Sequence, residues 1–226
     1  GKSASIAWMS LADTYAAEIM ANVGFDALVL DMQHGMGIGP DRAAAWLQAV
    51  STTDTVPMVR VAWNEPHLIQ WVLDAGAYGV IVPLVNNKEE TQKAVGATRY
   101  PPLGYRSLGP NRVRFYAGSD YYQNANDGII CLVMIEDIKT IDHLESMTTV
   151  PGIDGFYVGP ADLAISLGTS PSSYLEDIEH AKACQTVLET AKASRLIAGV
   201  HCSSLGEALQ RFEQGFQICP VAIDVG

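Results

Sequence analysis

The chain has 226 residues, of which 48% are hydrophobic, and its formal net charge at pH 7 is −11. A chain of this size can bury one large core, and single α/β barrels often have about this length. The negative charge argues against a nucleic-acid partner, because phosphate binding needs a basic surface. We therefore expect a single domain over residues 1–226 that does not bind nucleic acid.

Short apolar runs alternate with segments of helical length along the whole chain, which is typical of repeated strand–helix units with parallel strands. The expected strands cover residues 5–8, 25–31, 56–60, 79–83, 129–136, 155–158, 196–200 and 218–223. The expected helical stretches include residues 14–22, 40–50, 66–75, 88–98 and 175–193. Such units closing on themselves form an α/β (β/α)8 TIM barrel, whereas a doubly wound sheet rarely needs so many parallel strands in a chain this short. No eighth helix is expected after the last strand.

Membrane segments and disulfides are not expected. No run of about 18 apolar residues occurs, and the opening GKSASIAWMS lacks the long apolar stretch of a signal peptide. A cytoplasmic protein without a membrane partner is therefore predicted. The cysteines form no CxxC pair, so reduced structural thiols are expected at Cys131, Cys184, Cys202 and Cys219.

One Pro- and Gly-rich segment, RYPPLGYRSLGPNRVR at residues 99–114, concentrates positive charge in this acidic chain. No Asp or Glu occurs between Glu90 and Asp120. Such a loop can attract a small anion, but it can equally be a solvated loop with incidental arginines. Both interpretations remain open for Arg99, Arg106, Arg112 and Arg114.

Polar side chains occupy five expected strand ends, which is where TIM barrels place their active sites. These residues are Asp31 with the nearby His34, Arg60, Glu136 with Asp137, Asp162 and His201. Each has an ordinary alternative, since a terminal Asp can cap a helix and a single His is more often structural. Their agreement at one end of the barrel favours a catalytic site that includes Asp31.

Glu136 and Asp162 are the expected metal ligands. Two carboxylates without a partnering Cys suit octahedral Mg²⁺ or Mn²⁺, with Co²⁺ as a further candidate, better than a closed Zn²⁺ site. The sequence GPAD, from Gly159 to Asp162, places Pro160 near a helix start at Ala161 or Asp162. Free backbone N–H groups there could bind the carboxylate of a chelating 2-oxo acid beside the metal.

Several segments resemble the HpcH/HpaI aldolases, metal-dependent class II pyruvate aldolases typified by 4-hydroxy-2-oxoheptanedioate aldolase. The resemblance covers essentially the whole chain. PGIDGFYVGPADLAISLG carries it most specifically, together with VLDMQHG, VPMVRV, VLDAGAYGVIVP, RYPPLGYRS and VMIED. It implies reversible cleavage of a 4-hydroxy-2-oxo acid to pyruvate and an aldehyde through a metal-stabilised pyruvate enolate.

The resemblance also implies roles for individual residues. His34 would be the general base, and Arg60 would stabilise the enolate. Glu136 and Asp162 would be the metal ligands. Ala161 would offer its backbone N–H to the pyruvate carboxylate, and Asp74 would raise the basicity of His34.

Three positions depart from the pattern of the family. Gln33 stands where familiar bacterial members carry Glu, Met134 replaces a polar Gln, and His201 stands where an apolar residue is usual. These differences affect the pocket wall rather than the metal ligands. They therefore leave the natural substrate open more than the chemistry.

Two other functions remain as alternatives. A CoA-thioester lyase of the citrate lyase β or malyl-CoA type uses related metal chemistry, and a non-catalytic barrel could bind an oxo acid without turnover. A Schiff-base aldolase is not expected, because no lysine occurs at the carboxyl end of an expected strand.

The resemblance further implies a homo-oligomer, a hexamer built from trimers or dimers. Asp74 is expected at the end of its helix and His34 at the opposite end of the barrel, so the two should not meet within one chain. Asp74 of a neighbouring subunit is therefore expected to approach His34 and raise its pKa. The alternative is a surface Asp74 on a monomer.

Overall fold

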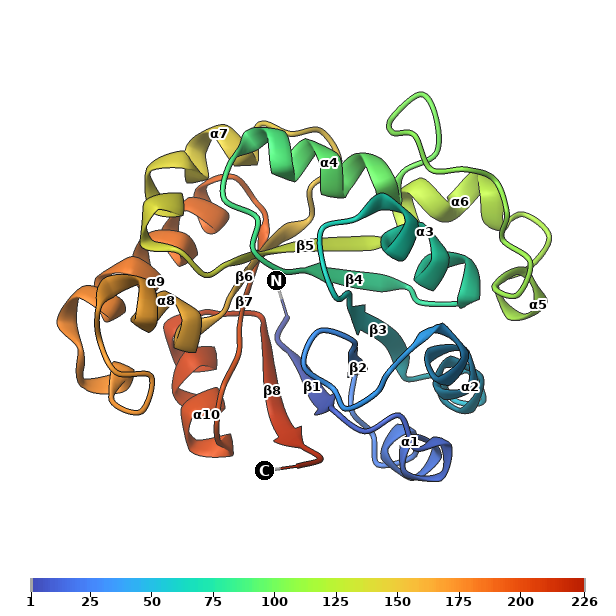
Figure 1. Ribbon diagram of the computed structural model, residues 1–226, viewed down its shortest axis with the longest axis horizontal. Helices are drawn as coiled ribbons and strands as arrows, with labels where there is room; N and C mark the ends of the chain where they lie inside the picture. Colours follow the sequence, from blue (N-terminus) through green and yellow to red (C-terminus); the bar gives the residue numbers. More distant parts are fainter. Residues whose placement is uncertain (1, 226) are drawn as a thin grey trace.

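A computed structural model describes residues 2–225 as a closed barrel of parallel strands surrounded by helices (Figure 1). The prediction of a TIM-type α/β barrel is therefore confirmed. Strands follow one another around the barrel in chain order, and β8 closes it by pairing with β1. They are β1 Ala4–Met9, β2 Ala27–Asp31, β3 Val56–Arg60, β4 Gly79–Val82, β5 Ile130–Ile135, β6 Gly155–Val158, β7 Ile197–Val200 and β8 Ile218–Ile223.

The helices form the outer layer around the strands (Figure 1). They are α1 Thr14–Ala21, α2 Pro40–Val50, α3 Pro66–Ala75, α4 Lys88–Thr98, α5 Arg114–Ala117, α6 Tyr121–Gly128, α7 Leu144–Thr148, α8 Pro160–Leu167, α9 Ile178–Ala193 and α10 Leu205–Gln214, with 3-10 turns η1 Ile138–His143 and η2 Tyr174–Glu176. No helix follows β8 up to residue 225, while Gly226 and Gly1 lie outside the described residues. None of the helices described is long and apolar enough to cross a membrane.

The strands alternate between an inner and an outer row of side chains, as the period of two requires. Inner residues such as Val29, Met58 and Leu132 form one buried cluster inside the barrel. Outer residues such as Leu28 and Val59 join a larger cluster beneath the helices. Both rows are apolar because helices cover the outside and packed side chains fill the inside.

The inner rows become polar toward the carboxyl ends of the strands. Asp31 follows Val29 in the inner row of β2, and Arg60 follows Met58 in that of β3. Both are buried. The same periodicity that fills the barrel therefore brings charged side chains to its carboxyl end.

Two arginines of the arginine-rich segment, Arg99 and Arg106, are buried in ion pairs, whereas Arg114 is exposed. The Arg99 guanidinium is buried and donates to the carbonyl oxygen of Ile129 and, at 2.6 Å, to Asp154. The fully buried Arg106 side chain pairs with Asp74 at 2.6 Å. These contacts lie at the amino ends of the strands, beyond the end of α4 and on the far side of the barrel from the predicted site. Arg99 and Arg106 are therefore structural, and their partners could not be predicted because Asp154 and Asp74 are distant from them in sequence.

Candidate active site

Asp31 and Arg60 form a buried ion pair at the ends of neighbouring strands. The register of β2 and β3 sets the two residues side by side, and Arg60 donates two hydrogen bonds to Asp31, one of them from Nε at 2.9 Å. Burial opposes ionisation of Asp31, but the hydrogen bonds and charge of Arg60 outweigh it and lower the pKa of this carboxyl. Trp8 also donates to Asp31 through its indole Nε1, at 3.4 Å. Arg60 is therefore held in a fixed orientation at the carboxyl end of the barrel.

His34 follows β2 in a turn that Asp31 organises. The backbone N–H groups of Gln33 and His34 both donate to Asp31 Oδ1, at 3.0 and 3.1 Å. The His34 side chain itself is exposed and lines a cavity that also contains Arg60. Asp31 thus positions both the cation and the loop that carries the histidine.

Glu136 and Asp162 come together in the same cavity, as the sequence predicts. Glu136 is 3% exposed, and its Oε2 accepts a hydrogen bond from the backbone N–H of Leu84 at 2.7 Å. Burial raises the pKa of Glu136 to about 7, and the charge of Asp162 acts in the same direction. A methyl group on Gly159 would lie 2.7 Å from Oε1 of Glu136, so only glycine leaves room for this carboxylate.

This pair fits a divalent cation by its donor chemistry. Within residues 2–225 there is no group of three or more His, Cys, Asp or Glu side chains that could hold a metal ion. The carboxylates of Glu136 and Asp162 repel each other, and a bound cation would remove this cost. Mg²⁺ and Mn²⁺ sites often combine one or two carboxylates with water and substrate oxygens, which matches the open cavity.

The amino end of α8 borders the two carboxylates. Gly159 caps the helix and Pro160 occupies its first turn, so the helix begins at Pro160, slightly earlier than predicted. The ring of His180, on α9, contacts the carbonyl oxygen of Pro160 through Nε2 at 3.0 Å. The first N–H groups of a helix have no partner within the helix, and Ala161, which carries one of them, lines the cavity.

The cavity has a volume of about 390 Å³ and is lined from several loops at the carboxyl ends of the strands. Its lining includes the predicted His34, Arg60, Met134, Glu136, Gly159, Pro160, Ala161, Asp162 and His201. The sequence did not single out four further lining residues, Pro171, Tyr174, Ser203 and Ile223. None of the described residues that line the cavity is a lysine.

His201 packs against the aromatic interior of the barrel. Its ring meets Trp8 edge-on with centroids 4.7 Å apart, and Trp8 in turn stacks on Tyr157 at 5.9 Å. Gly199 makes room for this arrangement, because a Cβ there would lie 2.6 Å from the Tyr157 ring. Burial lowers the pKa of His201 to about 4, and the positive charge of Arg60 adds to the shift. His201 is therefore a neutral polar group beside the cavity.

Two other predicted residues lie outside the cavity lining. Asp137 caps η1 by accepting a hydrogen bond from the backbone N–H of Lys139 at 2.9 Å. Asp74 lies in the last turn of α3, near the amino ends of the strands, and pairs with Arg106. As expected from the topology, Asp74 does not reach His34 within one chain.

These observations define an enzyme class: a TIM barrel whose cavity, at the carboxyl ends of the strands, combines two carboxylates, a histidine and an oriented arginine. The sequence profile of the HpcH/HpaI aldolase/citrate lyase family matches residues 4–226. The chain therefore belongs to this family, and it is a carbon–carbon lyase.

Individual relatives agree over nearly their whole lengths. A hydroxypyruvate/pyruvate aldolase of Rhizorhabdus wittichii is 37% identical over 100% of this chain and 89% of its own. A 4-hydroxy-2-oxo-heptane-1,7-dioate aldolase of Salmonella dublin is 33% identical over 96% of this chain and 82% of its own. The crystal structure of a family protein from Burkholderia cenocepacia J2315 superposes with a TM-score of 0.91 at 31% identity, covering 99% of this chain and 89% of that one.

Proposed function

We propose that this enzyme is a pyruvate aldolase that cleaves 4-hydroxy-2-oxo acids to pyruvate and an aldehyde, and catalyses the reverse addition. The observation that carries the proposal is the single cavity that joins His34, Arg60, Glu136 and Asp162. The names of the R. wittichii and S. dublin relatives support the same chemistry.

His34 and Arg60 supply the acid–base and charge-stabilising groups of this mechanism. In the cleavage direction, His34 accepts the proton of the C4 hydroxyl group, directly or through water. The bond between C3 and C4 then breaks, the aldehyde leaves, and the electron pair remains on the enolate of pyruvate. Arg60, oriented by Asp31, faces the oxygen on which negative charge develops. His34 then returns its proton, directly or through water, to C3, which completes the formation of pyruvate and restores the starting form of His34.

Glu136 and Asp162 would hold a divalent metal, Mg²⁺ or Mn²⁺ with Co²⁺ as a further candidate, that polarises the 2-oxo group of the substrate. The backbone N–H of Ala161, at the amino end of α8, would bind the substrate carboxylate, with Gly159 and Pro160 shaping its approach. The proposal extends to the assembly, which we propose is a homohexamer in which Asp74 of one subunit approaches His34 of the next.

Two observations argue against the alternative functions, a CoA-thioester lyase and a non-catalytic binding barrel. Binding of a CoA thioester would call for cations at the cavity mouth, yet the arginine-rich segment lies at the opposite end of the barrel with Arg99 and Arg106 buried in ion pairs. A non-catalytic barrel would have no need of a histidine beside an oriented arginine and two carboxylates.

The test is an aldol cleavage assay with detection of pyruvate, run with EDTA and then with added Mg²⁺, Mn²⁺ or Co²⁺. We expect activity to disappear with EDTA and return with metal, and Glu136→Gln and Asp162→Asn to abolish it while the circular dichroism spectrum is retained. Pyruvate alone should exchange its methyl protons with D₂O in a metal-dependent manner. Absence of this exchange in proton NMR spectra would contradict the mechanism.

A further inference from the structure

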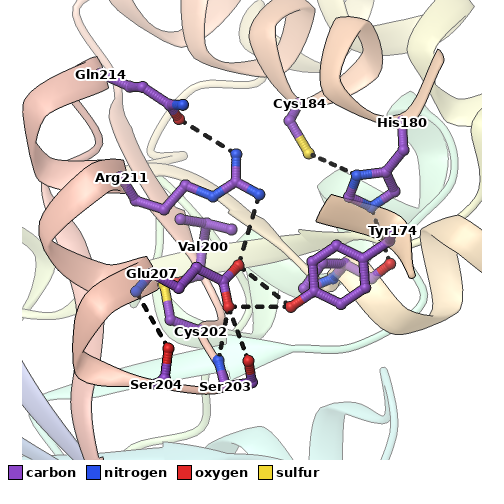
Figure 2. Close-up of polar contacts among 11 residues, drawn as sticks. Tyr174, His180, Cys184, Val200, Cys202, Ser203, Ser204, Glu207, Arg211 and Gln214 are labelled. Atoms are coloured by element: carbon purple, nitrogen blue, oxygen red, sulfur yellow. Dashed lines mark hydrogen bonds and ion pairs between the residues drawn. The ribbon is translucent and has the colours of Figure 1, made fainter. Parts of the chain in front are cut away.

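Besides Asp31 and Glu136, another buried carboxylate lies beside the cavity, and the proposed mechanism does not use it. Glu207, in the first turn of α10, is 4% exposed and lies at the centre of a hydrogen-bond network (Figure 2). The Tyr174 hydroxyl donates to its two oxygens, at 3.2 and 3.1 Å. Ser203 donates to its Oε2 from the backbone N–H at 2.9 Å and from Oγ at 3.0 Å.

The surroundings of Glu207 suit a carboxylate that accepts hydrogen bonds. Its polar neighbours are donors, and a guanidinium nitrogen of Arg211 lies 3.6 Å from Oε1. The backbone N–H of Ser203 and the guanidinium group of Arg211 can only donate, so a carboxylate satisfies both, and the Tyr174 and Ser203 hydroxyl groups then donate to it as well. The Arg211 side chain is 9% exposed and donates also to Gln214 at 3.2 Å, so its charge is committed to this network.

Glu207 fixes the hydrogen-bonding character of two residues that line the cavity. A hydroxyl group has one proton to donate and lone pairs to accept with. Tyr174 and Ser203 both line the cavity, and both give their hydroxyl proton to Glu207. Burial raises the pKa of Tyr174 to about 12, and the charge of Glu207 adds to the shift, so the hydroxyl keeps its proton. Only the lone pairs of these two oxygens remain for a molecule in the cavity.

This part of the cavity also lacks a free positive charge. Among the described residues that line the cavity, Arg60 is the only Lys or Arg, and it is paired with Asp31. Arg211 does not line the cavity. His201 lines it and is neutral, because its pKa lies near 4. A carboxylate beside Tyr174 and Ser203 would therefore meet lone pairs backed by a buried negative charge, whereas a hydroxyl group could donate to them.

We infer that the end of the cavity walled by Tyr174, Ser203 and His201 receives the aldehyde and selects short, uncharged hydroxyaldehydes over aldehydes that carry a carboxylate. Glu207 is the positioning residue that sets this preference. The inference rests on the proposed function, in which Arg60, Ala161 and the two metal-binding carboxylates take the pyruvate part of the substrate and leave this end for the aldehyde.

The test compares glycolaldehyde with glyoxylate, which have nearly the same size and differ in bearing a hydroxymethyl or a carboxylate group. Their kcat/KM values are measured in the addition direction with saturating pyruvate and Mg²⁺. We expect the native enzyme to favour glycolaldehyde by roughly tenfold or more, the effect of one hydrogen bond gained against one unfavourable contact. Equal values, or a preference for glyoxylate, would overturn the inference.

Variants test the part played by Glu207. In Glu207→Gln the amide N–H can donate to Tyr174 or Ser203 and release a hydroxyl proton toward the cavity, so the preference for glycolaldehyde should fall by roughly tenfold. Glu213→Gln, an exposed change on the same helix, should leave the ratio unchanged. A general loss of stability would lower both kcat/KM values together and leave the ratio as it was, and that result would overturn the role of Glu207.

Two further measurements keep the test decisive. If Glu207→Gln does not fold, Tyr174→Phe and Ser203→Ala each remove one accepting oxygen and should also lower the ratio of kcat/KM for glycolaldehyde to that for glyoxylate. An unchanged ratio in both variants would reject the inference.

Exchange of pyruvate protons in D₂O without any aldehyde reports on the enolate chemistry alone. Exchange without a preference for glycolaldehyde would leave the proposed function standing and overturn only the inference, whereas loss of exchange would remove the proposed function itself.

Discussion

At the scale of single residues, His201 gives the protein a characteristic pH dependence. Its pKa in the folded protein is about 4, against about 6.5 in an unfolded chain. Between these values the unfolded state binds a proton that the folded state does not, so the free energy of unfolding should fall as pH falls from about 6.5 to 4. The full loss would be up to about 3 kcal/mol.

Urea unfolding at pH 7 and pH 4.5 measures this loss. His201→Gln should show a clearly smaller difference between the two pH values, whereas His67→Gln, a change at an exposed histidine, should behave like the native protein. Equal pH dependence in the native protein and His201→Gln would contradict the prediction.

The ion pair of Asp31 and Arg60 should contribute far more to stability than a surface pair. Asp31→Asn leaves the Arg60 guanidinium buried without its counter-charge, which should reduce the free energy of unfolding by about 3 to 5 kcal/mol. Glu179→Gln breaks the exposed pair with Lys182, whose side chains are 66% and 68% exposed, and should cost less than about 1 kcal/mol. Denaturant titration of both variants makes the comparison, and similar losses would refute it.

The residues at strand ends could be predicted from sequence, and those in the connecting loops could not. Asp31 and Arg60 follow apolar runs whose period of two fixes the face on which they lie. Tyr174 lies in a short 3-10 turn inside an irregular segment, so no periodicity indicates its direction. Glu207 resembles an ordinary first-turn glutamate, because its partner Tyr174 is distant in sequence and meets it only after α9 and α10 have packed.

At the scale of elements, the junction between β6 and α8 depends on Gly159. A Cβ at this position would approach Oε1 of Glu136 to 2.7 Å, so Gly159→Ala should displace this carboxylate and weaken Mn²⁺ binding by about tenfold or more. Gly206→Ala is the matched control, because its Cβ would meet nothing nearer than Ser204 Oγ at 3.9 Å. Titration with Mn²⁺ followed by electron paramagnetic resonance measures the metal affinity of both variants. Unaltered affinity in Gly159→Ala would contradict the prediction, because it would mean that the Glu136 carboxylate can move aside without loss of binding.

Sequence periodicity placed the strands to within about two residues, which is the usual precision of element boundaries. The helical stretch expected at residues 175–193 is in fact divided. Asp177 accepts a hydrogen bond from the backbone N–H of His180 at 2.9 Å and begins α9, while η2 precedes it. This side-chain cap competes with continuation of the helix, a local choice that a hydrophobic pattern does not reveal.

At the scale of the whole molecule, the two ends of the barrel explain why Arg99 and Arg106 take no part in the predicted site. The barrel has a catalytic end and an opposite end, and a segment is assigned to one of them by the helix that precedes it. Residues 99–114 follow α4 and therefore lie at the amino ends of the strands, where Arg99 and Arg106 pair with Asp154 and Asp74. The number of arginines in a segment does not show at which end of the barrel the segment lies. It therefore could not distinguish a structural arginine from an anion-binding one.

The position of Asp74 leads to a prediction about the assembly. Arg106 binds its Oδ1 at 2.6 Å, while Oδ2 has no hydrogen-bond partner within residues 2–225 and the side chain is 26% exposed. In the proposed hexamer this carboxylate approaches His34 of a neighbouring subunit, favours the imidazolium form and raises the pKa of that histidine. Light scattering should therefore detect an oligomer, and the structure of the assembly should contain an Asp74 carboxylate within one water molecule of His34.

Kinetics offers a test of the same contact through a matched pair of variants. Asp74→Asn should lower the apparent pKa of the basic group in the pH profile of kcat/KM, because the imidazolium form of His34 loses its neighbouring negative charge. Asp154→Asn removes an equivalent carboxylate, which pairs with buried Arg99 at 2.6 Å on the same side of the barrel, and should leave that pKa in place. A shift of equal size in both variants would assign the effect to the loss of a buried ion pair, and a monomeric native protein would remove the basis for coupling between subunits.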